Sequence, residues 1–256
     1  MANKGGRSMN KSRTWYLHRL QGIPEVAILV GDSRRLELFS KKLKDPDIDV
    51  SHHNFALLTG EYKGVPLSVM AYGMGAPAVA VAIEELAALG AKVIVRAGTA
   101  MAVSCPLGSL LLAEGGVRLE GTSSSYLPIE FPAIPDHGLL NAFEKSLSTL
   151  NVPCYLGLIA SLDGLYPNRL KEEKVDIALF RRLGVVGMDM ETATVYAVSR
   201  VLGLKAVSLC LTSVEFGSFE VLAEEMRRPL EELLVEAALE GIRSYYEPKK
   251  ERRSGS

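Results

Sequence analysis

The sequence predicts an α/β protein built on a central mixed, mostly parallel β-sheet. Short, continuous apolar runs that end at glycine or at a turn are typical of strands buried on both faces of a sheet. Segments with apolar residues at helical spacing separate these runs, and this alternation favours strands joined by helices. No internal repeat or linker breaks the pattern, so we expect one domain over residues 15–246. We expect disorder in the N-terminal extension 1–14 and in the tail 247–256.

The predicted strands are the apolar runs of the sequence. The first reads Val-Ala-Ile-Leu-Val over residues 26–30 and ends at Gly31. The third is expected to break at Gly98, because glycine weakens the interior of a strand. The full set covers residues 26–30, 67–71, 92–96, 109–113, 155–161 and 205–212.

The predicted helices lie between these strands and after the last one. Pro77 stands just before the second helix, where proline suits the first turn. Gly203 follows the third helix, and glycine is typical of a helix end. The predicted helices cover residues 34–44, 78–89, 189–202 and 229–245.

The charge balance argues against two classes of partner. The chain has 29 Lys and Arg against 30 Asp and Glu, which gives a formal net charge of -1. This balance favours neither a nucleic-acid-binding surface nor attraction to an anionic membrane. No apolar run approaches the roughly 20 residues that span a bilayer. Any anion that binds this chain must therefore be held by a local site.

The cysteine pattern predicts neither a metal site nor a disulfide framework. Cys105, Cys154 and Cys210 are odd in number, lie far apart and show no C-x-x-C spacing. We expect them to be buried thiols of a protein in the reducing cytoplasm.

Two arginine-containing turns follow predicted strands. The first, Gly31-Asp32-Ser33-Arg34-Arg35, combines a glycine that permits close approach of a ligand with a helix start and a guanidinium fork. In the second, Arg96-Ala97-Gly98-Thr99, an arginine leaves an apolar strand. Because ligands bind beyond the carboxyl ends of strands in open α/β sheets, Arg35 and Arg96 could converge on one oxyanion. Two alternatives stay open: the first arginine pair is solvated, or Arg96 pairs with a structural carboxylate.

A carboxylate stands in the apolar stretch 188–193, which reads Met-Asp-Met-Glu-Thr-Ala. Glu191 could accept hydrogen bonds from two vicinal hydroxyls of a ribose. Met190 could pack against the apolar face of the sugar. The alternative is a first-turn Glu191 that only complements the helix dipole, and spacing alone favours this alternative.

Taken in order, these motifs resemble the nucleoside phosphorylase family that contains the hexameric purine and uridine phosphorylases. The resemblance extends over residues 18–245 and is closest to the uridine phosphorylase branch in segments 117–121 and 128–133 and at Tyr166-Pro167. The matching pieces are Gly31-Asp32-x-x-Arg35, Gly73-Met74-Gly75-Ala76-Pro77 followed by Ile83-Glu84-Glu85-Leu86, Arg96-Ala97-Gly98-Thr99, and Met190-Glu191-Thr192-Ala193.

The resemblance implies a three-layer α/β/α fold and a pentosyltransferase activity. Phosphate would attack the anomeric carbon of a nucleoside, uridine by preference, and release ribose 1-phosphate and a free base. Phosphate would be the co-substrate, with no metal or organic cofactor. The family also implies a homo-oligomer built from dimers, of which a hexamer is one form.

The resemblance also assigns roles to single residues. Phosphate would be held by Gly31, Arg35, His53, Arg96 and Thr99. Ribose would be held by Met190, Glu191 and His18, the last reaching over from a neighbouring subunit. The base would lie near Tyr166, Arg169 and Lys171. Arg96 and Glu191 would carry the catalysis.

Several positions depart from the family pattern. His53 stands where the family often has an arginine donated by the adjacent subunit, and histidine is charged only part of the time at neutral pH. Met101 replaces a glycine, and Val214 stands where the purine branch has an aspartate. Residues 168–171 only partly match the glutamine and arginine with which the uridine branch reads uracil.

These departures leave other activities open. They are a purine nucleoside or methylthioadenosine phosphorylase, a hydrolytic nucleosidase, and a nucleoside-binding protein without catalysis. A nucleosidase would need a carboxylate base for water and no pair of phosphate arginines, so Arg35 and Arg96 favour phosphate.

Overall fold

A computed structural model of the chain describes residues 14–50, 55–164, 166 and 176–254. Within these ranges nine strands form one sheet: β1 (Val26–Val30), β2 (Lys44–Val50), β3 (Ala56–Tyr62), β4 (Val65–Ala71), β5 (Val93–Ala102), β6 (Leu110–Arg118), β7 (Cys154–Ser161), β8 (Val185–Asp189) and β9 (Lys205–Glu215). The helices are α1 (Arg35–Ser40), α2 (Ala76–Ala88), α3 (Thr122–Tyr126), α4 (His137–Thr149), α5 (Ile177–Arg182), α6 (Thr192–Val201) and α7 (Glu224–Ser254).

The sheet is mixed, and parallel pairs are in the majority, as predicted. Its order is β2-β3-β4-β1-β5-β8-β7-β6-β9, with a further pairing of β5 with β9. That pairing closes a ring of strands from β5 through β8, β7, β6 and β9 back to β5. Parallel pairs join β1 to β4 and β5, β5 to β9, and β7 to β6 and β8.

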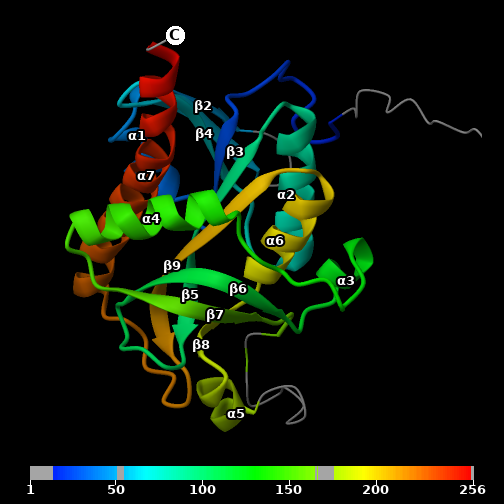
Figure 1. Cartoon of the computed structure of the whole chain (residues 1–256), viewed down its shortest axis with the longest axis vertical. Helices are drawn as coiled ribbons and strands as arrows, with labels where there is room; N and C mark the ends of the chain where they lie inside the picture. Colours follow the sequence, from blue (N-terminus) through cyan, green and yellow to red (C-terminus); the bar gives the residue numbers. More distant parts are fainter. Residues whose placement is uncertain (1–13, 51–54, 165, 167–175, 255–256) are drawn as a thin grey trace, which may run out of the picture.

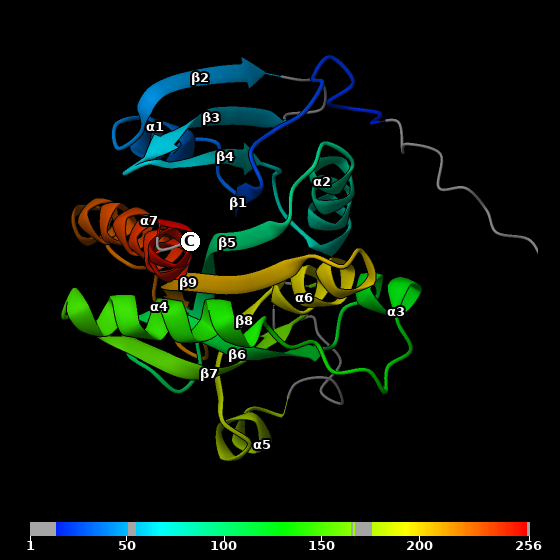
Figure 2. The same ribbon diagram turned by 45° about the horizontal axis from the view of Figure 1, so that its top comes forward.

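Helices cover both faces of the sheet, which gives the three layers of the predicted fold. Helices α4 and α7 lie on one side and α2 and α6 on the other (Figures 1 and 2). The alternation of side chains along each strand supplies both cores. In β1, Val26, Ile28 and Val30 belong to the core that includes residues of α1, α4 and α7, whereas Ala27 and Leu29 belong to the core that includes residues of α2 and α6. The continuous apolar run therefore reflects a strand buried on both faces.

Two predicted boundaries are wrong near the centre of the sheet. Strand β5 does not break at Gly98, because its backbone pairing continues and sets Gly98 opposite Cys210 of β9. The helix expected at 189–202 begins only at Thr192, because Asp189 ends strand β8. Pairing of β8 with β5 and β7 outweighs the helical pattern of this stretch.

Other differences lie at the edge of the sheet and at the C-terminus. Strand β2 was not predicted, because this edge strand reads Lys-Asp-Pro-Asp-Ile-Asp-Val and lacks the apolar pattern of a buried strand. Strand β3 and helix α4 were also missed. The closing helix is longer at both ends than the predicted 229–245, and α7 extends through most of the tail 247–256 for which we expected disorder.

Glu240 of α7 joins this helix to the β3–β4 hairpin. Its buried carboxylate accepts hydrogen bonds from Tyr62 Oη at 2.6 Å, from Lys63 Nζ and from Arg243 Nε at 2.7 Å. Burial by itself would raise the pKa of Glu240, but the three donors together lower it to about 2. The ionised carboxylate therefore stabilises the fold.

We expect Glu240→Gln to lower the free energy of unfolding at pH 7 by about 2 kcal/mol, the order expected when a buried charged hydrogen-bond acceptor is lost. Because the folded-state pKa lies below the ordinary 4.5, this stabilisation is present above pH 4.5 and is lost as the pH falls toward 2. Urea unfolding between pH 7 and pH 3 measures the difference. Glu236→Gln is the control, since Glu236 pairs with Lys42 where both side chains are 41% exposed. A difference that does not shrink at low pH would contradict the prediction.

Candidate functional site

A cavity of about 1130 Å³ opens at the carboxyl ends of the parallel strands. Residues from the ends of β1, β4, β5, β8 and β9 line it, together with the first turns of α1 and α7. This is the place where α/β sheets bind ligands, because several chain reversals bring polar groups together there. Arg35, Arg96 and Glu191, which come from three distant parts of the sequence, all line this cavity.

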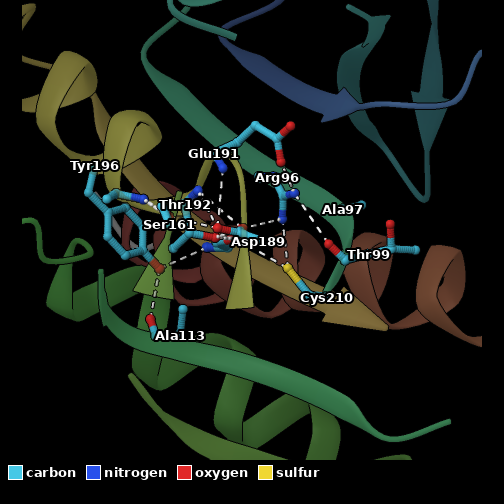
Figure 3. A network of polar contacts seen from close by, with 12 residues as sticks. Arg96, Ala97, Thr99, Ala113, Ser161, Asp189, Glu191, Thr192, Tyr196 and Cys210 are labelled. Atoms are coloured by element: carbon cyan, nitrogen blue, oxygen red, sulfur yellow. Dashed lines mark hydrogen bonds and ion pairs between the residues drawn. The ribbon is translucent and has the colours of Figure 1, made fainter. Parts of the chain in front are cut away.

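Arg96 is a buried cation at the centre of the site. Its side chain leaves β5, and its guanidinium group lies 2.6 Å from Glu191 Oε2 and 3.1 Å from Asp189 Oδ2 (Figure 3). Nη1 also lies 2.7 Å from Cys210 Sγ. Burial alone would lower the pKa of Arg96, but the groups around it, Cys210 foremost, raise the pKa well above its usual value. Arg96 therefore keeps its charge inside the protein.

Asp189 holds the polypeptide that carries Glu191. Its carboxylate accepts hydrogen bonds from Ser161 Oγ at 2.6 Å and from Thr192 Oγ1 at 2.5 Å (Figure 3). It also accepts from the backbone N–H groups of Glu191 and Thr192 at the start of α6. With Arg96 as a further partner, Asp189 ties β5, β7, β8 and α6 together.

Glu191 does not act as a simple complement to a helix dipole. It precedes α6, and its Oε1 accepts a hydrogen bond of 2.6 Å from the backbone N–H of Gly75, just before α2. Its Oε2 pairs with Arg96. The sequence left two interpretations of Arg96: part of an oxyanion site, or the partner of a structural carboxylate. In the structure Arg96 pairs with the carboxylates of Asp189 and Glu191, and both of these residues also line the cavity.

Arg35 is the buried member of the arginine pair after β1. Only 3% of its side chain is exposed, whereas that of Arg34 is 77% exposed and pairs with Asp32. Arg35 Nη1 donates to Ala97 O at 3.3 Å, and Nη2 donates to Glu231 Oε1 at 3.2 Å. The solvated-pair alternative therefore describes Arg34 and not Arg35.

Two buried donors in this site have no described partner. They are the Nε–H groups of Arg35 and Arg96, which form no hydrogen bond within the described part of the chain. Buried polar groups are nearly always paired, so each exception needs an explanation. Both groups belong to residues that line the cavity, which is consistent with a site for an anion.

The remaining predicted residues fall into three groups. Gly31, Thr99, Met190 and Tyr166 line the same cavity. His18 lies on the surface outside it, with Nδ1 3.2 Å from Trp15 O. His53, Arg169 and Lys171 lie outside the described residues.

Glu85 of α2 fixes the segment that leads to His18. Its carboxylate, buried with 7% exposure, accepts backbone hydrogen bonds from Trp15, Tyr16 and Leu17 at 2.8 to 3.0 Å. The chain around His18 is therefore anchored to a helix that begins beside the cavity.

One side of the cavity is apolar. Met101 of β5 lies in register with Met188 of β8 and with Val214 of β9, and all three line the cavity. Phe219 and Val221, which follow β9, also line it. The cavity thus combines cations, carboxylates and an apolar wall, an arrangement that suits an anion, a polyol and a flat ring.

Sequence reasoning missed Tyr72, Arg227 and Glu231, which belong to or adjoin the cavity. Tyr72 is buried directly after β4, and burial raises its pKa well above the ordinary value, so it is an un-ionised hydroxyl. Arg227 and Glu231 are four residues apart on α7, and in the sequence they are indistinguishable from a solvated i, i+4 pair.

Among the described residues, no three His, Cys, Asp or Glu side chains gather as a metal-binding group. Within the same part of the chain, no helix has the length and apolar character needed to cross a membrane.

These features define a three-layer α/β protein with a cavity lined by charged and apolar side chains at the carboxyl ends of its strands. A sequence model described as the phosphorylase superfamily matches residues 25–228. The chain therefore belongs to the phosphorylase superfamily, in agreement with the resemblance drawn from its motifs.

Individual relatives agree with this assignment. The chain is 33% identical over 202 residues to the uridine phosphorylase of Thermococcus kodakarensis, covering 73% of this chain and 72% of that protein. It is 29% identical over 251 residues to the Escherichia coli uridine phosphorylase, covering 92% and 99%. The guanosine phosphorylase of Halorubrum lacusprofundi is 30% identical over 190 residues, covering 73% and 77%. The crystal structure of the Vibrio fischeri ES114 uridine phosphorylase in complex with 6-hydroxy-1-naphthoic acid matches with a TM-score of 0.78 and 28% identity, covering 86% of this chain and 91% of that chain.

Gly98 is a testable element of this geometry. A Cβ atom at this position would overlap the guanidinium group of Arg96. We expect Gly98→Ala to displace Arg96 from Glu191 and to lower the free energy of unfolding by roughly 2–4 kcal/mol, because a buried ion pair is broken. A crystal structure and urea unfolding of the variant check both effects.

Gly22→Ala is the matched control, because an added Cβ there would meet only Leu89 O at an ordinary 3.6 Å. An alanine at position 98 that left the pair of Arg96 with Glu191 in place would show that the glycine is not required by this contact.

Proposed function

We propose that this protein is a nucleoside phosphorylase that uses inorganic phosphate to cleave the N-glycosidic bond of a nucleoside, with uridine favoured. The products are ribose 1-phosphate and the free base. The observation that carries the proposal is the presence of Arg35, Arg96 and Glu191 in one cavity. Membership of the phosphorylase superfamily and identity to uridine phosphorylases support it.

Phosphate binds at the end of the cavity that carries Arg35 and Arg96. Guanidinium groups donate paired, charge-assisted hydrogen bonds to phosphate oxygens, and the buried Nε–H groups of both residues are donors without a described partner. Gly31 and Thr99 complete this end of the site. His53 is a further phosphate ligand from a neighbouring subunit in this proposal, in the place of the family's arginine.

Ribose binds between this end and the apolar wall. The two oxygens of Glu191 accept hydrogen bonds from the vicinal hydroxyls, and Met190 packs against the sugar. In the structure these oxygens already accept hydrogen bonds from Arg96 and from the Gly75 N–H. The ribose hydroxyls therefore compete with Arg96 for Glu191, and phosphate competes with Glu191 for Arg96. His18 of a neighbouring subunit reaches the 5′-hydroxyl.

The chemistry needs no protein nucleophile. Phosphate attacks the anomeric carbon as the base leaves, and positive charge develops on the sugar ring. Arg96 orients the nucleophile, while the Glu191 carboxylate favours the cationic sugar, so the site supplies positioning and electrostatic stabilisation. Tyr166, Arg169 and Lys171 contact the base, and the two basic residues stabilise the departing anion. The reaction as proposed uses phosphate as co-substrate, with no metal or organic cofactor.

The proposal includes a homo-oligomer built from dimers, of which a hexamer is one form, acting in nucleoside salvage in the cytoplasm. A site completed by His18 and His53 of a neighbouring subunit requires at least a dimer. The surface position of His18 and the anchoring of its segment by Glu85 are compatible with this arrangement.

A substrate panel tests the proposal. Uridine, inosine, guanosine, adenosine and methylthioadenosine are each incubated with the full chain, with and without phosphate. We expect uracil and ribose 1-phosphate from uridine only when phosphate is present. Preference for guanosine would indicate the purine activity that one relative carries. Base release without phosphate would indicate a nucleosidase, and no release from any nucleoside would overturn the enzyme assignment.

Glu191→Gln tests the ribose role. The amide keeps the size of the side chain but removes the charge that favours the oxocarbenium-like transition state, so we expect kcat to fall by roughly 10²–10³. Stopped assays of uracil release measure kcat, and the melting temperature checks the fold. Glu144→Gln, an exposed carboxylate on α4, is the control and should keep normal kcat. A folded Glu191→Gln protein with near-normal kcat would remove Glu191 from the mechanism.

A further inference from the structure

We infer that Arg227 is a further phosphate-contacting residue, which supplies a third guanidinium group to the cavity from within the same chain. The inference deepens the proposed function and rests on it. Arg227 lies in the first turn of α7, where its backbone N–H donates to Ala223 O at 2.9 Å. Its side chain lines the same cavity as those of Arg35 and Arg96.

Arg227 and Arg35 share one hydrogen-bond acceptor, the carboxylate of Glu231. A single oxygen, Glu231 Oε1, accepts a hydrogen bond from Arg227 Nε and another from Arg35 Nη2, each at 3.2 Å. The two guanidinium groups therefore approach the same point from α7 and α1. Because phosphate oxygens accept the same charge-assisted hydrogen bonds as a carboxylate, an anion beside this point meets both groups.

Arg227 keeps donors available for such an anion. Its only hydrogen bond to another described side chain uses Nε, so Nη1 and Nη2 donate to no described residue. A guanidinium group carries five N–H donors in a planar fork. The side chain is 27% exposed, so the fork can reach a ligand without first leaving the protein interior.

The ion pairs at the two ends of the cavity differ in their balance of charge. The single cation of Arg96 pairs with two carboxylates, those of Asp189 and Glu191. Arg35 and Arg227 share the one carboxylate of Glu231. Asp32, which also lines the cavity, pairs with Arg34. Within the group of Arg35, Arg227 and Glu231, cations therefore outnumber carboxylates by one, and a phosphate anion between α1 and α7 offsets this charge.

This excess charge also bears on the departure at position 53. His53 stands where the resemblance implies a permanently charged arginine from a neighbouring subunit. Arginine is charged at every physiological pH, whereas histidine is not. Arg227 thus provides within one chain the third permanent charge that the family pattern takes from a second.

The test measures the binding of inorganic phosphate alone to the full chain, by calorimetry at constant ionic strength. Arg227→Gln removes the charge, and Arg227→Lys keeps it. Arg228→Gln is the matched control, since this neighbouring side chain is 72% exposed and lies 3.7 Å from Glu232. We expect Arg227→Gln to raise the Kd for phosphate about tenfold, Arg227→Lys to recover part of the loss, and Arg228→Gln to stay within twofold. An unchanged Kd in Arg227→Gln overturns the inference.

Glu231→Gln separates phosphate contact from a purely structural pairing on α7. If Arg227 only holds Glu231, the two variants lower the melting temperature alike and change the Kd in the same direction. If Arg227 contacts phosphate, the directions differ. Arg227→Gln weakens phosphate binding, and Glu231→Gln strengthens it about threefold because a competing carboxylate charge is removed. Changes in the same direction overturn the inference.

Kinetics distinguishes this inference from the proposed function. In Arg227→Gln, we expect KM for phosphate to rise about tenfold while KM for uridine stays within twofold. A wild-type chain that binds phosphate but releases no base from any nucleoside overturns the proposed function, and the Kd comparison still decides the role of Arg227. A wild-type chain that binds no phosphate overturns both.

Discussion

The structure depends on a positive charge buried inside a β-sheet. Transfer of a guanidinium group from water to the protein interior costs several kcal/mol unless partners compensate it. Arg96 stands on β5, the strand that pairs with β1, β8 and β9, and it is compensated by Asp189 and Glu191. Asp189 is the last residue of β8, and Glu191 lies two residues after it. The ion pairs therefore link β5 to the end of β8, within the closed ring of strands that forms the cavity.

Hydrogen bonds link the two carboxylate partners of Arg96 to neighbouring strands and helices. Asp189 accepts from Ser161 on β7 and from the first turn of α6, while Glu191 accepts from the Gly75 N–H before α2. Each of these contacts satisfies a donor that would otherwise be buried without a partner, including backbone groups at helix starts. Stability and site geometry therefore come from the same residues, and a change in one alters the other.

Sequence reasoning succeeded where the pattern was local. The strands at 26–30 and 205–212 were predicted correctly, because a short continuous apolar run that ends at a turn is typical of a buried strand. The boundary between β8 and α6 could not be predicted, because apolar side chains continue on both sides of it and strand pairing there depends on β5 and β7. For the site, Arg35, Arg96 and Glu191 came from a family resemblance, since spacing alone left solvated or structural alternatives. Arg227 carried no signal, because its link to Arg35 joins helices almost 200 residues apart, a contact that local pattern does not encode.

The cavity has a charged part and an apolar wall, and two of the departures from the family pattern, Met101 and Val214, belong to the apolar wall. The cations Arg35, Arg96 and Arg227 come from α1, β5 and α7. Met101 and Val214 belong to the apolar wall, where they lie in register on neighbouring strands. These two side chains shape the apolar wall, and the pairing of β5 with β9 holds them side by side. Under the proposed function, the base therefore lies against the wall that carries positions 101 and 214, and phosphate lies at the end of the cavity that carries the guanidinium groups.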